Sequence, residues 1–200
     1  LDNVSYQYPN AEANAVDSFS GTLETGKLTA LLGCNGSGKS TIAKLAAGLT
    51  HPDSGTVLLN KNFLSAGWNG IGYLFQYPDD QFITASIESE LAYGLENLAL
   101  PPDQIVLEVK KALHQFHLLH LKDRSPEQLS DGQKQLVALV SVLLMHPKFL
   151  VLDEALSYLD LAWQQRIWQI ISEINPKTGI LWITTRTAEA LRADEVWLIN

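Results

Sequence analysis

The segment from residue 27 to residue 49 constrains the fold more than any other part of the chain. The apolar run KLTALLG (27–33) predicts a buried strand, and KSTIAKLAAGL (39–49) predicts a helix. The Gly-rich turn between them, GCNGSGKS (33–40), matches G-x-x-x-x-G-K-[ST] in the strand–turn–helix context that this phosphate-binding pattern requires. We therefore expect a nucleotide-binding site at this turn.

The residue types of this phosphate loop suit the binding of a polyphosphate. Glycines let backbone N–H groups curl around phosphate oxygens, and the start of the following helix adds the positive end of its dipole. Lys39 can reach the terminal phosphates, and the Ser40 hydroxyl is placed to hold Mg²⁺. The expected nucleotide-binding residues of the loop are Asn35, Gly36, Ser37, Gly38, Lys39, Ser40 and Thr41.

A second apolar run, KFLVLDE (148–154), predicts a buried strand that ends in two acids. In proteins with a phosphate loop such a strand delivers an aspartate to Mg²⁺, and Asp153 fits that role. Glu154 follows it and could act as general base toward an attacking water, so the pair indicates hydrolysis. The stretch NKNF (60–63) lacks the aspartate of the guanine-reading Asn-Lys-x-Asp, so we expect ATP rather than GTP.

Strand-like and helical patterns alternate in both outer thirds of the chain, whereas the middle is helical. This alternation implies an α/β fold with a mostly parallel sheet covered on both faces, and the helical middle implies an inserted subdomain. Strands are expected at 1–8, 27–33, 56–60, 71–76, 148–154, 179–185 and 195–200, and helices at 39–49, 86–98, 102–119, 130–145 and 160–174.

Composition excludes several other classes of protein. The net charge of −8, from 14 basic and 22 acidic residues, gives no overall basic footprint for nucleic acid. The single cysteine, Cys34, allows no internal disulfide, which fits a reducing compartment. The longest apolar run, LVALVSVLLM (136–145), is about half of what a membrane-spanning helix needs. The chain begins with Leu1 rather than Met, so both ends could be trimmed.

The stretch LSDGQ (129–133) lies between the two motifs, just before a long apolar helix. Ser130 followed three residues later by Gln133 predicts a capping box, and Asp131 in the first turn suits the helix dipole. With this stretch in place, the chain resembles the ATP-binding cassette (ABC) ATPases over essentially its whole length. LSDGQ is similar to their signature Leu-Ser-Gly-Gly-Gln, which makes Ser130, Gly132 and Gln133 expected ATP contacts.

Further positions match motifs of that family. Tyr8 stands where the family stacks an aromatic ring on adenine, and Gln76 matches the Gln loop, which contacts Mg²⁺ and couples to a partner. Asp160 matches the loop that crosses the dimer interface. The stretch 73–100, with PDDQ and ESELAYGLENL, is similar to ATPases of energy-coupling-factor vitamin and metal importers.

The resemblance implies a RecA-like P-loop NTPase core with N-terminal antiparallel strands. It implies a single ABC ATPase domain over 1–200, with the nucleotide-binding core at about 1–80 and 147–200 and a helical signature subdomain at about 81–146. It also implies ATP and Mg²⁺ as cofactors, the metal held by Ser40, Gln76 and Asp153, and ATP enclosed between two ATPase subunits. Transmembrane subunits would then place the chain in the cytoplasm, on the inner face of the membrane.

The chain departs from the family pattern at several positions. Asp131 replaces the first signature Gly, and Thr185 replaces the His that contacts the γ-phosphate; Arg186 replaces the Asp after it. Ala155 and Cys34 stand where Pro is common. Loss of a positioned donor to a developing charge costs on the order of 3 kcal/mol, or about 100-fold in rate. We expect a chain that binds ATP but hydrolyses it slowly with Glu154, Lys39, Gln76 and Thr185.

Two alternatives stay open at this point. The chain could be a non-hydrolysing or regulatory partner in an asymmetric dimer, or a soluble ABC ATPase of DNA repair or translation, although the long insertions typical of that class are absent. His114, His117 and His120 have a spacing of three, which could line one helical face as a metal site or simply place polar residues there. Trp163 is interpreted as a packing residue.

Overall fold

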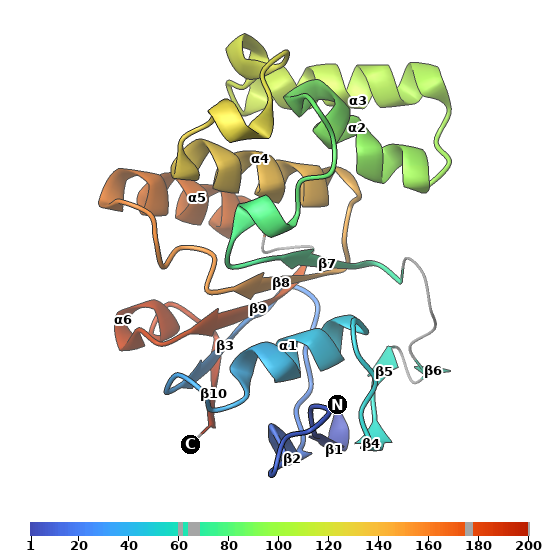
Figure 1. Ribbon diagram of the computed structural model, residues 1–200. Helices are drawn as coiled ribbons and strands as arrows, with labels where there is room; N and C mark the ends of the chain where they lie inside the picture. The colour runs from blue at the N-terminus through green and yellow to red at the C-terminus, as the bar shows by residue number, and fades with distance from the viewer. Residues whose placement is uncertain (60–61, 64–68, 175–177, 200) are drawn as a thin grey trace. The chain divides into compact units, whose positions relative to one another are not determined.

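The structure is a computed structural model that describes residues 1–59, 62–63, 69–174 and 178–199. The chain divides into two compact units (Figure 1). The first comprises Leu1–Tyr73, Lys148–Glu154 and Asn175–Asn200, and the second comprises Leu74–Pro147 and Ala155–Ile174. The expected strand ends at Asn60 and Asn200 lie outside the described residues.

The first unit is built around a sheet whose described strands follow the order β10-β3-β9-β8-β7. Strand β3 runs parallel to both β9 and β10, and β8 runs parallel to β9, which confirms the mostly parallel core. Each of β3, β8 and β9 is almost wholly buried, as their continuous apolar runs predicted. The bounds are β3 Leu28–Gly33, β7 Ile71–Leu74, β8 Phe149–Asp153, β9 Gly179–Thr184 and β10 Glu195–Ile199.

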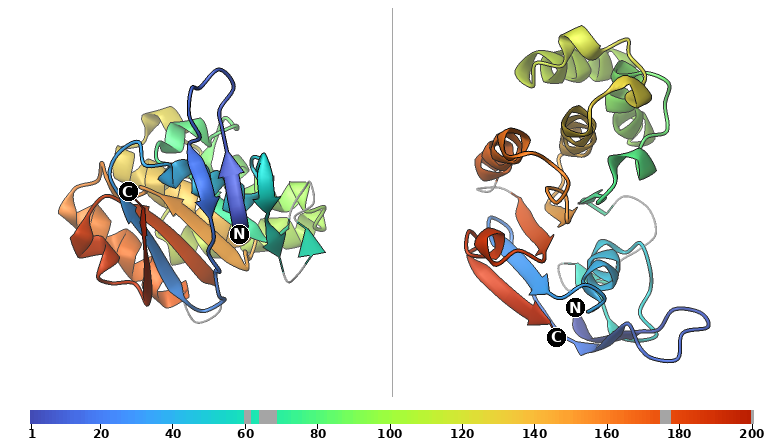
Figure 2. Two further views of the ribbon diagram at one scale, coloured as in Figure 1. Left: turned by 90° about the horizontal axis from the view of Figure 1, so that it is seen from below. Right: turned by 60° about the vertical axis from the view of Figure 1, so that its left-hand side comes forward.

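The N-terminal strands of this unit are antiparallel, as expected. Strand β1 (Asp2–Tyr6) pairs with β2 (Val16–Phe19) on one side and with β4 (Ser54–Thr56) on the other (Figure 2). Strands β5 (Leu58–Leu59) and β6 (Asn62–Phe63) form a short antiparallel pair. The expectation of one strand over 56–60 was wrong, because the chain leaves the first ladder at Val57 before it enters the second.

Helix α1 (Lys39–Ala47) contacts β3, β8 and β9 with a face that buries Ile42, Ala43 and Leu45. It ends two residues earlier than expected because Gly48 adopts a left-handed φ of 73°, and the amides of Gly48 and Leu49 then close the last turn. The short helix α6 (Thr187–Ala190) follows β9.

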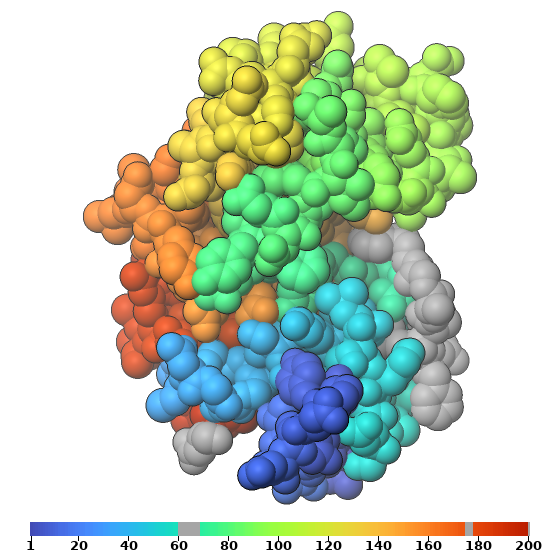
Figure 3. All heavy atoms as spheres, in the orientation of Figure 1, coloured from blue at the N-terminus to red at the C-terminus, as the bar shows by residue number. Residues whose placement is uncertain are grey.

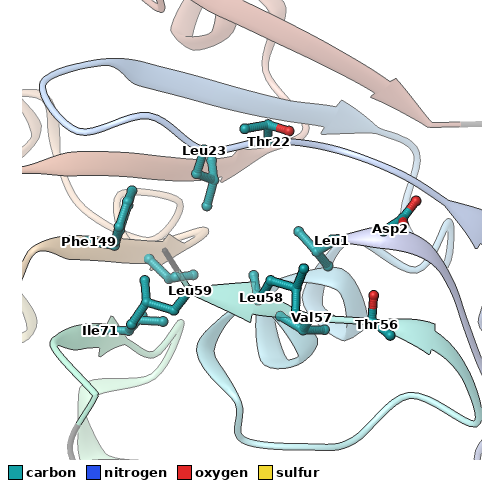
Figure 4. A pocket seen from close by; sticks show the side chains of 12 residues that line it. Leu1, Asp2, Thr22, Leu23, Thr56, Val57, Leu58, Leu59, Ile71 and Phe149 are labelled. Atoms are coloured by element: carbon teal, nitrogen blue, oxygen red, sulfur yellow. The ribbon is translucent and has the colours of Figure 1, made fainter. Parts of the chain in front are cut away.

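An apolar cavity of about 420 Å³ also lies in the first unit (Figure 4). Its lining includes Leu1, Leu23, Leu58, Ile71 and Phe149. None of its described lining residues belongs to the phosphate loop, so it is separate from the candidate nucleotide site.

The second unit is helical and has its own core. Its buried core side chains include Leu91, Leu95, Val109, Leu113, Leu136 and Val140, with the partly buried Trp163 and Ile170 packed against them. The bounds are α2 Ile87–Asn97, α3 Pro102–Gln115, α4 Asp131–Leu144 and α5 Leu161–Ile174, with 3₁₀ turns η1 Pro78–Asp80, η2 Leu119–Leu121 and η3 Pro126–Gln128. Within the described residues, no helix combines the length and apolar character that crossing a membrane requires.

The helical part differs from the sequence expectation in two places. The helix expected over 102–119 ends at Gln115, and His117 then adopts a left-handed φ of 57°, so His114, His117 and His120 do not share a helical face. Residues 155–174, expected in the nucleotide-binding core, group with the helical unit by their contacts. The functional division into core and signature subdomain stays a prediction.

Candidate nucleotide-binding site

The phosphate loop joins the end of β3 to the start of α1. Gly36 and Gly38 have φ values of 81° and 89°, a left-handed region that other residues enter only with strain. A side chain at Gly38 would also collide with the carbonyl oxygen of Ala15, which lies just before β2. Gly38 is the N-cap of α1 and no side chain caps that helix, so its first amides are directed at the loop.

Lys39 is buried at the base of this loop, with 4% of its surface exposed. Its ammonium donates a hydrogen bond of 2.7 Å to the carbonyl oxygen of Cys34, across the loop. A buried ammonium needs such a partner because its desolvation is otherwise costly. The result is a positive charge held against the loop, where an anion bound to the loop amides would meet it.

Three hydroxyl or carboxyl groups meet beside the first turn of α1. The Ser40 hydroxyl donates to Oδ1 of Asp153 over 3.0 Å, and the Tyr73 hydroxyl donates to Oδ2 over 2.7 Å. Asp153 ends β8 and is 6% exposed, so the strand delivers a nearly buried carboxylate to the phosphate loop. Hard oxygen donors of this kind suit Mg²⁺, and Ser40 and Asp153 are two of its three expected ligands.

Tyr73 was not singled out from the sequence. Burial raises the pKa of its hydroxyl above the ordinary value of 10.0, and the neighbouring Asp153 carboxylate raises it further by its charge and its hydrogen bond. The hydroxyl therefore stays protonated at neutral pH and remains a donor to Asp153. The sequence signal was weak: a tyrosine within a buried strand, 80 residues from its partner.

Tyr8 lies beside the same helix. Its hydroxyl shares a hydrogen bond of 3.1 Å with Thr41, and its ring makes an edge contact with Tyr6 at 5.0 Å between centroids. The residue is 40% exposed, so it remains available for contact with a planar ligand. Figure 3 shows the N-terminal strand residues next to the segment of the phosphate loop and α1.

The carboxyl ends of β8 and β9 bring the expected catalytic residues to one edge of the sheet. The Glu154 amide donates to the carbonyl oxygen of Ile183 over 3.2 Å, and Glu154 has a left-handed φ of 48°. Thr185 follows β9 at this edge and is exposed. Glu154, the expected general base, and Thr185, at the histidine position, thus directly follow the ends of two adjacent strands.

Arg186, which stands at the position of a family aspartate, is held within its own segment. Its amide donates to the Thr184 hydroxyl over 3.0 Å, and its guanidinium lies 3.2 Å from a carboxylate oxygen of Glu189. The Thr184 hydroxyl in turn donates to the other oxygen of Glu189 over 2.6 Å. These bonds fix the start of α6 directly after Thr185, a local arrangement that the sequence did not predict.

The remaining expected site residues lie in the helical unit. Gln76 donates from Nε2 to the Tyr158 hydroxyl over 3.2 Å, and the Tyr77 and Tyr158 rings stack with centroids 5.2 Å apart. Because Gln76 belongs to this unit and Ser40 and Asp153 to the other, the set of three as one magnesium site stays a prediction.

The signature stretch forms the start of α4 as the sequence predicted. The Gln133 amide donates to the Ser130 hydroxyl over 3.4 Å, and the Ser130 amide donates to the Gln133 side chain over 3.0 Å. This is a complete capping box, with Asp131 exposed in the first turn. A side chain at Gly132 would collide with the indole of Trp163, so the glycine permits close packing with α5.

Within the described residues, no group of three or more His, Cys, Asp or Glu side chains is arranged to hold a metal ion. The structure brings together Tyr8, the phosphate loop from Asn35 to Thr41, Asp153, Glu154 and Thr185 in one unit. It groups Gln76, Ser130, Gly132, Gln133 and Asp160 in the other.

Comparison with known proteins identifies the family of this chain. A family model described as "ABC transporter" matches residues 16–157. The energy-coupling factor transporter ATP-binding protein EcfA1 of Geobacillus kaustophilus is 36% identical over all of this chain and 74% of its own length. The corresponding protein EcfA of Pediococcus pentosaceus is 38% identical over the same shares.

Solved structures agree in fold. The structure of cbiO1 from Clostridium perfringens, part of the ABC transporter complex cbiONQ, matches with a TM-score of 0.83 at 32% identity. That match covers all of this chain and 83% of the other. A dimeric ATP-binding cassette in a post-hydrolysis state, bound to ADP and Pi, matches all of this chain and 93% of the other with a TM-score of 0.86. At 21% identity the second match speaks for the fold alone.

Proposed function

This chain belongs to the ABC transporter family as one of its ATPases, and we propose that it powers an energy-coupling-factor-type importer of a vitamin or a metal ion. The observation that carries the proposal is the cluster of Lys39, Ser40 and Asp153 at the start of α1. The names of the relatives support the importer class, since several are energy-coupling factor transporter ATP-binding proteins. The substrate would be selected by membrane subunits.

In this proposal the phosphate loop binds the polyphosphate of ATP through its amides and Lys39. Ser40 and Asp153 would hold Mg²⁺, together with Gln76, and the metal would supply charge neutralisation to the phosphate oxygens. Tyr8 contacts the adenine ring. Asn35, Gly36, Ser37, Gly38 and Thr41 complete the nucleotide-binding set.

Glu154 is the proposed general base for the attacking water. It is suited to this role because it extends from the same strand as Asp153, one residue further along, at the edge where β9 also ends. The proton of the water would pass to its carboxylate as the oxygen attacks the terminal phosphorus, while the bond from that phosphorus to the β–γ bridging oxygen breaks and ADP leaves. Thr185 would donate a hydrogen bond to the phosphate from the position where relatives of this family carry a histidine.

A second ATPase subunit completes the site. Ser130, Gly132 and Gln133 would contact ATP bound to the phosphate loop of that subunit, and Asp160 would lie at the shared interface. Support comes from the cbiO1 structure, whose protein is part of an ABC transporter complex and is 32% identical to this chain. Closure on ATP and reopening after hydrolysis would drive transmembrane subunits, with this chain on the cytoplasmic face of the membrane and no nucleic-acid partner.

We further propose that hydrolysis is slow. Thr185 is shorter than histidine and carries no charge, so it stabilises a developing negative charge less well. The Arg186 guanidinium is paired with Glu189. The loss of one positioned donor costs on the order of 3 kcal/mol, or about 100-fold in rate. If hydrolysis were absent rather than slow, the chain would be a regulatory partner in an asymmetric dimer, a second candidate that Thr185 and Asp131 favour.

Single-turnover hydrolysis of ATP by the purified chain tests the catalytic part. We expect a slow rate that Glu154→Gln abolishes and that Thr185→His raises by up to about 100-fold. A rate that Thr185→His leaves unchanged would contradict the slow-hydrolysis proposal. If neither the unchanged chain nor Thr185→His hydrolyses ATP, alone or with its partner subunit, the result would favour the regulatory candidate.

Purification from membranes tests the transport part. We expect a tagged Glu154→Gln chain, held in its ATP-bound form, to co-purify with integral membrane proteins and a second ATPase subunit. Recovery with ribosomal or DNA-repair components and without membrane proteins would contradict the importer and favour a soluble ABC ATPase.

A further inference from the structure

The first turn of α5 and the first turn of α4 touch through one side chain. A Cβ atom added at Gly132 would overlap Cγ, Cδ1 and Cδ2 of Trp163, at distances that real Cβ atoms do not reach. The indole therefore lies directly on the backbone of the signature stretch. Trp163 is half-buried and also packs against the core of the helical unit, so the core holds the indole in this contact.

The same residue is tied to the Asp160 loop. Oδ1 of Asp160 accepts a hydrogen bond of 2.9 Å from the Trp163 amide, and the Asp160 carbonyl accepts one of 2.9 Å from the amide of Gln164. The Gln164 side chain donates to the carbonyl oxygens of Leu159, over 2.7 Å, and Leu156, over 3.3 Å. The segment from 156 to 160 is thus fastened to the first turn of α5.

A third contact limits how far the indole can move. The Arg166 guanidinium carbon lies 5.1 Å from the centroid of the Trp163 ring, within the range of a cation–π contact. The same guanidinium donates to the carbonyl oxygen of Phe116 over 2.9 Å, just after the end of α3. The ring is therefore held both by α4 and, through Arg166, by the end of α3.

From these contacts we infer that Trp163 is a positioning residue, which fixes the distance between the signature turn at Gly132 and the loop at Asp160. The inference rests on the proposed function, in which both segments meet the second subunit around one ATP. Two contact segments kept at a fixed spacing can engage that subunit together, whereas a variable spacing would leave one misplaced when the other docks. A misplacement of about 1 Å in a group of residues that must act together can lower the rate by about 100-fold.

Hydrogen exchange tests the positioning directly. In the Trp163→Leu chain without nucleotide, we expect amides 131–134 and 157–163 to exchange about tenfold faster, because both turns lose their shared support. Amides 34–41 of the phosphate loop should be unaffected. Trp163→Phe should restore much of the protection, and Trp168→Leu, which removes another half-buried indole from α5, is the matched control. Unchanged exchange in Trp163→Leu, or the same change in Trp168→Leu, would overturn the inference whatever the function.

ATP-dependent assembly tests the consequence. In the Glu154→Gln background, with the natural partner subunit where one is required, we expect Trp163→Leu to weaken assembly by about 10- to 100-fold. The affinity of the separate chain for ATP should not change. In the chain that keeps Glu154, Trp163→Leu should lower kcat without raising KM. If the reference assembles and Trp163→Leu assembles equally well, the inference is wrong. If the reference itself fails to assemble, the dimer of the proposed function is wrong, and the exchange result still decides the role of Trp163.

Discussion

Two helix starts carry most of the expected ATP contacts, and they are built in opposite ways. Helix α1 begins after Gly38, whose missing side chain leaves the first turn uncapped, and this turn carries no acidic residue. Helix α4 begins after Ser130, which forms a complete capping box with Gln133, and carries Asp131 in its first turn. The first amides of an uncapped helix can donate hydrogen bonds to an anion. In a capped helix, a side chain already accepts a hydrogen bond from one of these amides.

On the proposed function, this difference would let the α1 start bind phosphate by itself, whereas the α4 start would only assist. The α1 start adds a buried Lys39 and the Asp153 cluster within its own unit. The α4 start is stable without a ligand, and its negative charge opposes a polyphosphate. A signature of this kind would act as a weak second clamp on ATP that another subunit already holds. Four predictions test that comparison.

The largest effect is expected on ATP affinity, from the lysine at the start of α1 and not from the one at the start of α4. Lys39→Met should lower the affinity for ATP by about 100- to 1,000-fold, because a positioned cation next to the phosphates is lost. Lys134→Met is the matched control, since Lys134 pairs with Asp79 at 2.7 Å and is not expected to meet ATP in the separate chain. Binding of a fluorescent ATP analogue measures both. An equal loss in the two variants would remove the distinction between the helix starts.

The loop glycines should differ in their effect on folding. Gly38→Ala combines a left-handed backbone with a collision against the Ala15 carbonyl oxygen and should cost about 3 kcal/mol in free energy of unfolding. Gly36→Ala has a similar φ but open space around the added carbon, so it should cost about 1 kcal/mol. Urea unfolding measures both, and equal losses would show that backbone strain alone shapes the loop.

The serines before the two helices should also differ. Ser130→Ala should lower the free energy of unfolding by about 1 kcal/mol because it removes the α4 cap. Ser37→Ala should cost far less, since the Ser37 hydroxyl is buried and has no hydrogen-bond partner among the described residues. Thermal unfolding without nucleotide is the measurement. A larger loss from Ser37→Ala than from Ser130→Ala would contradict the contrast between capped and uncapped starts.

The smallest effect is expected from the signature acid. Asp131→Gly should raise ATP-dependent dimerisation or the ATPase rate by a few-fold, since it removes a negative charge from the start of α4. Asp131→Asn removes the charge without adding backbone freedom and should cost about 0.5 kcal/mol of stability through the lost dipole interaction. If both variants assemble and hydrolyse as the unchanged chain does, Asp131 points away from the second subunit.

The sequence predicted the features that are contiguous in the chain. The phosphate loop, the capping box at Ser130 and the strand before Asp153 each depend on neighbouring residues, and all three have the expected local structure. The parallel core and the family were also predicted, and the comparisons confirm them. The roles of the individual site residues stay predictions.

What the sequence did not predict depends on distant partners or on a single backbone angle. Strand β2 has four residues, too few for a clear alternation, and pairing with β1 defines it. Apolar residues continue past the end of α3, but the left-handed His117 stops the helix. The hydrogen bond from Tyr73 to Asp153 and the contact of Trp163 with Gly132 join residues that no local pattern connects. Trp163 was interpreted only as a packing residue.

The order of the parallel strands has a consequence for the synthesis of the protein. Strand β3, which ends at the phosphate loop, lies between β9 and β10, so both of its neighbours are made from residues 179–199. At about 5–20 residues per second, a ribosome needs roughly 8–30 s to pass from Leu28 to Gly179. The nascent β3 therefore emerges with both edges unpaired, while all four long helices of the helical unit are completed before either neighbour exists. On the ribosome, the phosphate loop should be among the last parts of this chain to become native.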